Sequence, residues 1–136
     1  MRTKFDEQLL IQQQPVARDM RTITSAMKMV TDMERIGDQA ADIAELTILL
    51  SNHPYLLKED NIKQMSVETI VMLMHAIEAY VERDINKAQN VIDNDDIVDN
   101  LFLKVKSDLI ETIRSHPDHA EQAADLLMVN KYLERI

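Results

Sequence analysis

The residues best placed to do chemistry are carboxylates spaced four residues apart. Glu34, Asp38 and Asp42 follow one another at this spacing, and Glu45 comes three residues later. A helix turns by about 100° per residue, so these side chains would form one stripe. Like charges at this spacing repel by about 0.2–0.5 kcal/mol per pair, so the stripe is either a face in water or a place for a cation. The spacing alone favours the face in water.

A second group of carboxylates makes a stronger case for a cation. Four aspartates lie within residues 93–99, and Asp95 falls at an apolar position of the helical repeat. An unpaired carboxylate in a protein core is costly, so we expect Asp95 to be paired, protonated or bound to a metal. Arg35 or Arg83 is the candidate for an ion pair.

The alternative to an ion pair is a cation held between Asp95, Asp99 and a glutamate from a facing helix, for which Glu134 is the candidate. Carboxylates on neighbouring helices of a bundle build metal sites in this way. Oxygen ligands favour Mg, Ca, Mn or hard iron, whereas zinc more often needs histidine. The histidines are expected at helix ends or, for His75, in a structural role.

The composition excludes several classes of function. Asp and Glu outnumber Lys and Arg by 24 to 15, so we expect neither a nucleic-acid partner nor direct insertion into a membrane. No apolar run approaches the length of a membrane helix and no signal peptide is recognisable, so we expect a cytoplasmic protein. Cysteine is absent, and no catalytic triad order, phosphate-binding glycine loop or zinc-protease motif occurs.

The scarcity of turn residues predicts an all-α fold. One glycine and three prolines are too few for a β-sandwich, a β-barrel or a Rossmann-type fold. Breaks in the pattern divide the chain into four helices, at about residues 15–50, 61–83, 85–114 and 118–136, with Pro15 opening the first and Asp84 capping the third. Helices of this length predict an elongated antiparallel bundle.

Apolar residues recur at spacings of three and four, which is typical of helices that pack nearly parallel. The expected seam of the first helix comprises Ile23, Ala26, Val30, Met33, Gly37, Ala40 and Ala44. That of the second comprises Val67, Ile70, Met74, Ile77 and Val81. That of the third comprises Ala88, Val91, Asp95, Val98, Phe102, Val105 and Leu109. We expect these seams to be buried, the first of them against another helix or a second copy of the chain.

The chain also contains a repeat at an offset of 100 residues. Met33-Glu34-Arg35-Ile36 returns as Leu133-Glu134-Arg135-Ile136. The first copy continues with Gly37-Asp38, whereas the sequence ends before the second copy could do so. This match indicates an interrupted tandem repeat.

The extended motif resembles a known family. The run from Gln14 to Arg21, followed by Met33-Glu34-Arg35-Ile36-Gly37-Asp38 and its continuation to Glu45, strongly resembles PhoU, the bacterial regulators of phosphate uptake. Residues 95–99 resemble the acidic stretch of the family's second repeat, and residues 131–136 resemble the opening of its second motif. The similarity covers nearly the whole chain.

The resemblance implies a fold and a function. PhoU proteins are tandem, spectrin-like three-helix bundles whose Glu-x-x-x-Asp motifs bind iron, zinc or other metals such as Mg or Mn. They regulate phosphate transport and homeostasis, and transcription indirectly, by working with a phosphate ABC transporter and a sensor histidine kinase. They are cytoplasmic, often homodimeric, and not enzymes. The metal ligands implied here are Glu34, Asp38, Asp42, Asp95, Asp99 and Glu134.

The sequence departs from the family pattern in ways that set the expected domains. About two helices of the first repeat are absent, and the last motif stops at Ile136. We therefore expect an incomplete first repeat in residues 1–53 and a second three-helix repeat in residues 54–136. The chain is a fragment, a partly ordered chain or a truncated relative. Two other classes of function stay open. One is a carboxylate metalloenzyme or a metal-binding or metal-storage bundle of ferritin type, and the other is a purely structural bundle. The absence of any Glu-x-x-His pair argues against the former.

Overall fold

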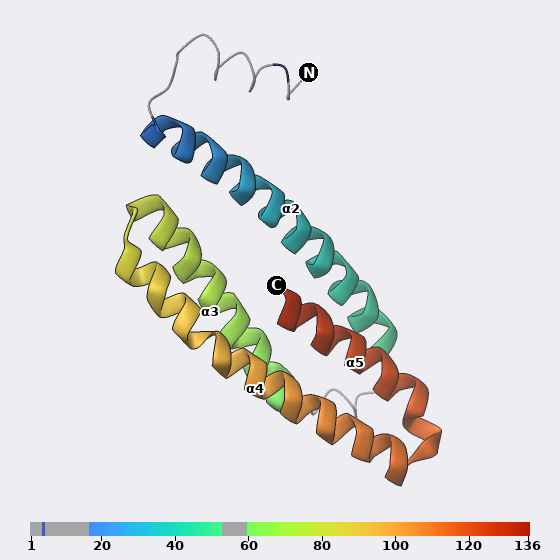
Figure 1. Cartoon of the computed structure of the whole chain (residues 1–136). Helices are drawn as coiled ribbons and strands as arrows, with labels where there is room; N and C mark the ends of the chain where they lie inside the picture. The colour runs from blue at the N-terminus through green and yellow to red at the C-terminus, as the bar shows by residue number, and fades with distance from the viewer. Residues whose placement is uncertain (1–3, 5–16, 53–59) are drawn as a thin grey trace. The chain divides into compact units, whose positions relative to one another are not determined.

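The computed structural model describes Lys4, residues 17–52 and residues 60–136. These form the helices α2 (Ala17–Leu50), α3 (Asp60–Glu82), α4 (Ile85–Ser115) and α5 (Ala120–Arg135), with the short 3-10 helix η1 (Pro117–His119) before α5 (Figure 1). No strand occurs among the described residues, and the all-α prediction is confirmed. Pro15 lies outside them, as do residues 53–59 of the break expected between the first two helices.

The chain divides into two compact units, residues 1–38 and residues 39–136, and each is described by itself. The boundary falls inside α2, so the last three turns of this helix belong to the second unit together with α3, α4 and α5. The expected domains, residues 1–53 and 54–136, stay a prediction. None of the helices in the described ranges has the length and apolar content that crossing a membrane requires.

The turn between α3 and α4 is held by backbone hydrogen bonds. The amide of Asp84 donates to the carbonyl of Ala79 at 3.0 Å, and the amide of Arg83 donates to the carbonyl of Tyr80 at 3.3 Å. This pair of bonds is a Schellman motif. Arg83 has a φ of 54°, in the left-handed region where glycine is usual. The side chain of Asp84 accepts from the Lys87 amide at 3.1 Å, which confirms the predicted cap of α4.

The second corner joins α4 to α5 through η1. The amide of His116 donates to the carbonyl of Thr112 at 2.9 Å and ends α4, and Pro117 opens η1. The imidazole rings of His116 and His119 stack with their centroids 5.5 Å apart. The helix expected from residue 118 therefore begins as a 3-10 turn and becomes α-helical at Ala120.

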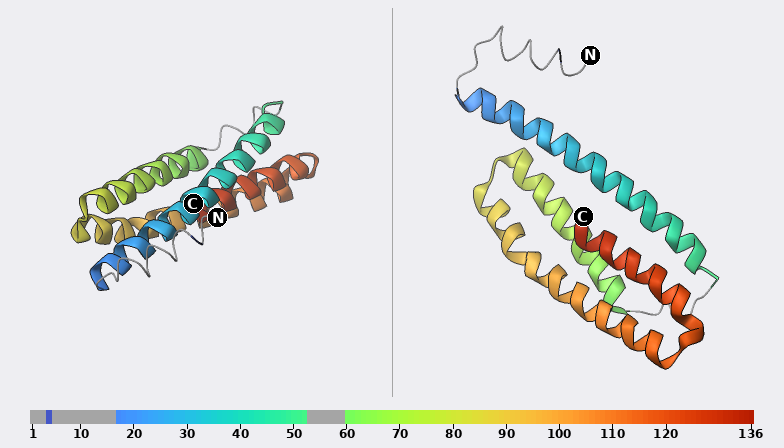
Figure 2. Two further views of the ribbon diagram at one scale, coloured as in Figure 1. Left: turned by 90° about the horizontal axis from the view of Figure 1, so that it is seen from above. Right: turned by 45° about the vertical axis from the view of Figure 1, so that its right-hand side comes forward.

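The core of the second unit lies between antiparallel helices. In the views of Figures 1 and 2, α3 and α4 form a hairpin and α5 lies along α4. The buried apolar cluster of the described residues comprises Leu50, Met65, Val98, Val105, Leu109, Ala123, Leu126, Val129 and Leu133. The end of α2 contributes Leu50, with Ile43 and Leu46 packed beside it. An antiparallel helical arrangement of this unit is what the sequence predicted.

The seam predicted for α3 is wrong. Val67, Ile70, Met74 and Val81 are exposed, whereas the buried residues of this helix are Met65, Thr69 and Ala79. The error has a physical cause, because α3 carries apolar side chains on two opposite faces and periodicity alone cannot choose between them.

The seams predicted for α2 and α4 are partly wrong. In α2, all members of the predicted seam except Ile23 are exposed: Ala26, Val30, Met33, Gly37, Ala40 and Ala44. The stripe that faces the core instead comprises Gln39, Ile43, Leu46 and Leu50. Larger apolar side chains gain more from burial than alanine does, and they decide which side of the helix turns inward. In α4, Val98, Val105 and Leu109 are buried as expected, but Ala88 and Asp95 are exposed.

The left-handed Arg83 gives the first testable prediction. Replacing Arg83 by Gly should raise the free energy of unfolding by about 1 kcal/mol, because a left-handed conformation costs a residue with a Cβ roughly 1–2 kcal/mol. The matched control is Arg114→Gly in the last turn of α4, which should lower stability because glycine disfavours a helix interior. Thermal unfolding followed by circular dichroism measures both changes. A melting temperature that falls in Arg83→Gly would contradict the prediction.

Candidate functional site

The carboxylates of the predicted first group lie on α2. Glu34, Asp38 and Asp42 are exposed and occupy successive turns of this helix. Within the part of the chain that the structure describes, none of the three forms an ion pair. Their arrangement is that of a face in water, the alternative that the spacing favoured.

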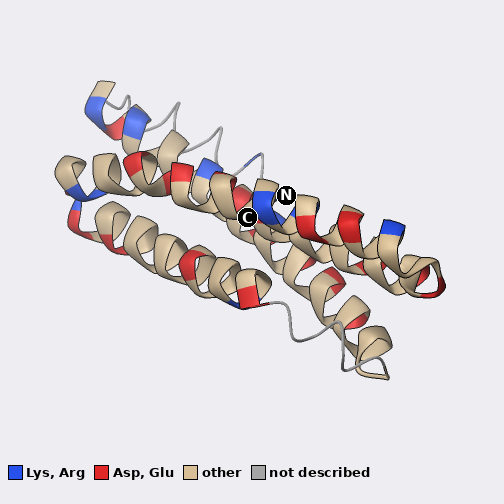
Figure 3. Ribbon diagram, turned by 90° about the horizontal axis from the view of Figure 1, so that it is seen from below, with Lys and Arg blue, Asp and Glu red and all other residues tan. Residues whose placement is uncertain are grey.

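The carboxylates of the second group lie on α4, and the environment of Asp95 differs from the one predicted. Asp95 is exposed rather than buried in a core. The stretch around it is acidic, and basic residues are the minority along the ribbons (Figure 3). Among the described residues of the second unit, no ion pair joins Asp95 to Arg83. The argument that Asp95 needs a partner because it is buried therefore fails.

Asp95 nevertheless lies in an unfavourable electrostatic environment. Its pKa is raised above the ordinary value of 3.8, first by partial desolvation and then by the negative charges of Asp99, Asp96 and Glu134. The charge of Glu134 acts from α5, so carboxylates of two different helices act on one another here. A cation at this position would relieve the repulsion.

Glu134 already has a cationic neighbour. Lys131 lies one turn earlier on α5, with its Nζ 2.8 Å from Glu134 Oε2. The same Nζ lies 5.3 Å from the centre of the Phe102 ring of α4, a cation–π contact. Lys131 therefore joins Glu134 to α4. A metal ion that used Glu134 as a ligand would have to displace this lysine.

A buried amide sets the register of α5 on α4. Asn130 is 0% exposed, and its Nδ2 donates to the backbone carbonyl of Phe102 at 3.1 Å. Glu134 comes one helical turn after Asn130, and Asp99 comes one turn before Phe102. Since the helices are antiparallel, this single hydrogen bond places Glu134 beside the acidic stretch of α4.

The fit to a metal can be judged from these contacts. Among the described residues, no three histidine, aspartate or glutamate side chains lie close enough together to hold an ion. The six predicted ligands thus do not form a ready-made site. In the second group, the mutual repulsion at Asp95 favours a cation and the Lys131–Glu134 ion pair opposes it.

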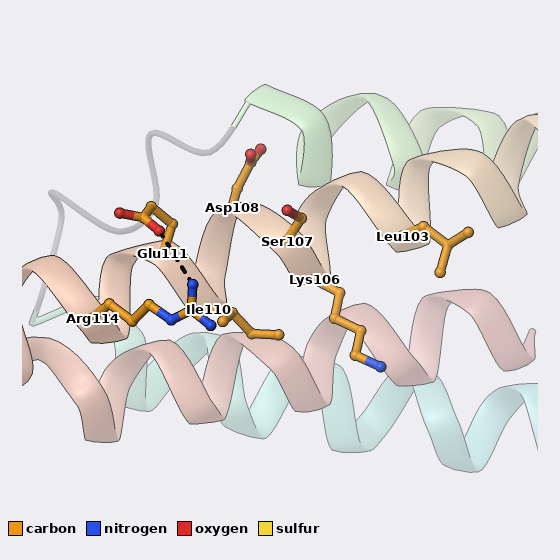
Figure 4. Close-up of a pocket in the computed structure, with 7 residues that line it drawn as sticks. All are labelled: Leu103, Lys106, Ser107, Asp108, Ile110, Glu111 and Arg114. Atoms are coloured by element: carbon orange, nitrogen blue, oxygen red, sulfur yellow. Dashed lines mark ion pairs between the residues drawn. The ribbon is translucent and has the colours of Figure 1, made fainter.

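A shallow pocket lies on α4 alone. Its lining residues are Leu103, Lys106, Ser107, Asp108, Ile110, Glu111 and Arg114, all from this one helix (Figure 4). Arg114 and Glu111 approach each other to 4.0 Å across it. One helix cannot enclose a substrate, and the positive and negative side chains of the lining balance one another. The pocket therefore offers no obvious chemistry.

Sequence reasoning missed Asn130 and Lys131, which hold Glu134 in place. A signal for Asn130 was present, because it is a polar residue among the apolar positions of α5 that recur at Ala123, Leu126 and Leu133. Lys131 could have been noticed from its spacing of three residues before Glu134. The contact of Lys131 with Phe102 depends on the packing of two helices and has no signal in the sequence.

Comparison with known proteins gives consistent results. The family model of the PhoU domain matches residues 1–47 and 62–136, which confirms the resemblance seen in the sequence. A protein of Clostridium acetobutylicum, named phosphate-specific transport system accessory protein PhoU homolog, is 39% identical over 131 residues, which is 94% of this chain and 59% of that protein.

Two further relatives bear the same name. The protein of Aquifex aeolicus is 35% identical over 122 residues, and that of Deinococcus radiodurans is 32% identical over 123 residues. The matches cover 90% of this chain in both cases and 55% and 58% of the relatives. The chain thus spans less than two thirds of the length of the curated relatives that it matches.

Asp95 gives the second testable prediction. Because its pKa is raised in the folded state, its ionised form opposes folding, and this cost disappears as the pH falls through that pKa. Asp95→Asn should therefore raise the free energy of unfolding near neutral pH by about 0.2–0.5 kcal/mol, as expected for an exposed like-charge pair. The gain should shrink as the pH falls toward 3.8, the ordinary value for this carboxyl.

The control for Asp95→Asn is Asp93→Asn, on the same helix. The Asp93 carboxylate accepts a hydrogen bond from Gln89 at 2.9 Å, and this variant removes the same charge from the chain. Urea unfolding at several pH values measures both variants. If the free energy of unfolding rises equally in Asp95→Asn and Asp93→Asn and does not depend on pH, only the net charge of the chain matters and the prediction is wrong.

Proposed function

Because the chain belongs to the PhoU domain family, we propose that it is a regulatory accessory protein of a phosphate uptake system. The observation that carries the proposal is the family match, which covers residues 1–47 and 62–136. The names of its relatives, phosphate-specific transport system accessory proteins, support the same role.

The proposed mechanism is that of an adaptor without catalytic activity. The protein acts in the cytoplasm as a homodimer and represses the phosphate-starvation response by linking a phosphate ABC transporter to a sensor histidine kinase. Its effect on transcription is indirect. The net charge of −9 supports a protein partner rather than DNA or an anionic lipid surface. Exposed helix faces are suited to such contacts, and the described residues offer many.

A reporter experiment tests the regulatory role. In a bacterium whose own PhoU gene is deleted, a promoter of the phosphate-starvation response should be active in high phosphate, and expression of this chain should silence it. A variant with Val105→Asp, which places a charge in the core, should not silence the promoter. The proposal is wrong if the promoter stays active while the unaltered chain accumulates in folded form.

We also propose that divalent cations bind the carboxylates predicted from the sequence, Glu34, Asp38 and Asp42 on α2, and Asp95, Asp99 and Glu134 of α4 and α5. Iron, zinc, Mg and Mn are the candidates. Support comes from the raised pKa of Asp95, which results first from partial desolvation and then from the charges of Asp99, Asp96 and Glu134; a bound cation would relieve this repulsion. The Lys131–Glu134 ion pair predicts that binding at the second group is weak.

Thermal unfolding tests this metal proposal. After treatment with a chelator, Mn or ferrous iron should raise the melting temperature of the wild type, and the effect should fade at low pH, where protons compete for the carboxylates. Asp95→Asn and Glu34→Gln should each lose part of the effect. An equal shift in the wild type and both variants would show that these carboxylates are not the ligands. Oxidation of ferrous iron by the protein would favour metal storage instead.

A further inference from the structure

Helix α3 has two apolar faces. Met65, Thr69 and Ala79 turn toward the core of the second unit. At about 100° per residue, Val67 and Met74 lie on the opposite side of the helix, and both are exposed. A helix that is apolar on two sides is normally covered on both. The outer face of α3 is therefore a candidate surface for a partner.

The outer face of α3 has an unusual spacing. Within an arc of about 100° it presents an uninterrupted apolar patch with one charged residue at each end. The residues in order are Lys63, Val67, Ile70, Val71, Met74 and Glu78. The intervals between them are four, three, one, three and four residues, which is the same sequence of intervals in either direction. Two such helices placed antiparallel would match position for position.

The charges at the two ends are complementary in that arrangement. Lys63 of one helix faces Glu78 of the other, at both ends of the pair, while Val67 faces Met74 and Ile70 faces Val71. Lys63 is the one lysine or arginine within α3, and neither it nor Glu78 forms an ion pair within the described residues. The parallel arrangement would instead place Lys63 against Lys63 and Glu78 against Glu78. Charge therefore selects the antiparallel pair.

The exposed apolar stripe of α4 lacks this self-complementarity. On α4, Ile92 and Leu103 lie on one stripe, but Asp96 and Asp99 lie between them or beside them. Two copies of that stripe would bring aspartates of both chains together. With Asp60, which precedes Lys63 in the same arc, the outer face of α3 has one positive and two negative residues, in a chain whose total charge is −9. Self-association is thus opposed less at α3 than at this stripe of α4.

We propose that α3 pairs antiparallel with α3 of a second copy of this chain, about a two-fold axis between Ile70 and Val71. The inference rests on the homodimer proposed above and identifies its surface. The interface is isologous, so each residue meets its counterpart twice. Its apolar centre drives association, and the two Lys63–Glu78 pairs fix the direction.

Cysteine crosslinking tests the geometry, because the natural chain has no cysteine. Val71 lies beside the proposed axis, so Val71→Cys should give a covalent dimer with a short bis-maleimide, across helices roughly 8–10 Å apart. Val81→Cys on the same stripe should not, because its two copies would lie about 30 Å apart along the helices at 1.5 Å per residue. Val81 is more exposed than Val71, at 72% against 39%, so reactivity alone would favour the opposite result. Equal crosslinking of both would overturn the antiparallel pairing.

Substitutions test the energetics by analytical ultracentrifugation. Lys63→Glu and Glu78→Lys should each weaken the dimer about tenfold, because each creates two like-charge pairs, and the double variant should restore it. Ile70→Glu should abolish the dimer, whereas Leu103→Glu on α4 should not. These two side chains are matched in exposure, at 57% and 59%. Circular dichroism checks that each variant is folded.

The outcomes separate this proposal from the proposed function. A wild-type chain that is monomeric at every concentration would overturn both the surface and the homodimer, and the reporter experiment would still test the regulatory role. If the Ile70→Glu variant still forms a dimer, the proposed α3 interface is wrong, whereas the homodimer itself is not contradicted. Protection of Val71→Cys from a maleimide in a monomer would mean that another part of the same chain covers α3, and would likewise overturn the proposal.

Discussion

The hydrogen bond between Asn130 and the backbone of Phe102 is the constraint on which the arrangement of α4 and α5 depends. The apolar side chains around it would tolerate sliding of one helix along the other, because hydrophobic contact has no direction. The Nδ2 group of the buried amide does not, since a slip of one turn would leave this donor without its acceptor at a cost of about 1–3 kcal/mol. A single polar residue thus gives a non-specific core a defined register, and it brings the carboxylate of Glu134 to the acidic stretch of α4.

The helix boundaries could be predicted because they depend on local chemistry. Asp84 at the start of α4 and Pro117 at the next corner act through a few neighbouring backbone groups, so the sequence contains the whole signal. The faces of the helices could not be predicted as well. Apolar residues at spacings of three and four identify a helix. In α3, however, two faces carry apolar residues, and only the packing of α4 and α5 decides that Met65 rather than Val67 is buried.

The candidate site could likewise be predicted only in part. Spacing identified the carboxylates, and their proximity in the second group depends on an antiparallel register that the sequence did not provide. The burial of Asp95 was inferred from its place in a heptad, yet this part of α4 is exposed and the raised pKa comes from partial desolvation together with neighbouring charges. Lys131, which neutralises Glu134, was overlooked because its cation–π contact joins residues far apart in the chain.

The tight turn at Arg83 also has a consequence for how the second unit folds. It joins two long helices through a connection so short that closing it costs little chain entropy, and the first contacts between α3 and α4 are between residues near in sequence. Contacts of low sequence separation form early. The hairpin is thus the natural nucleus, and α5 is a later addition to a template that already exists.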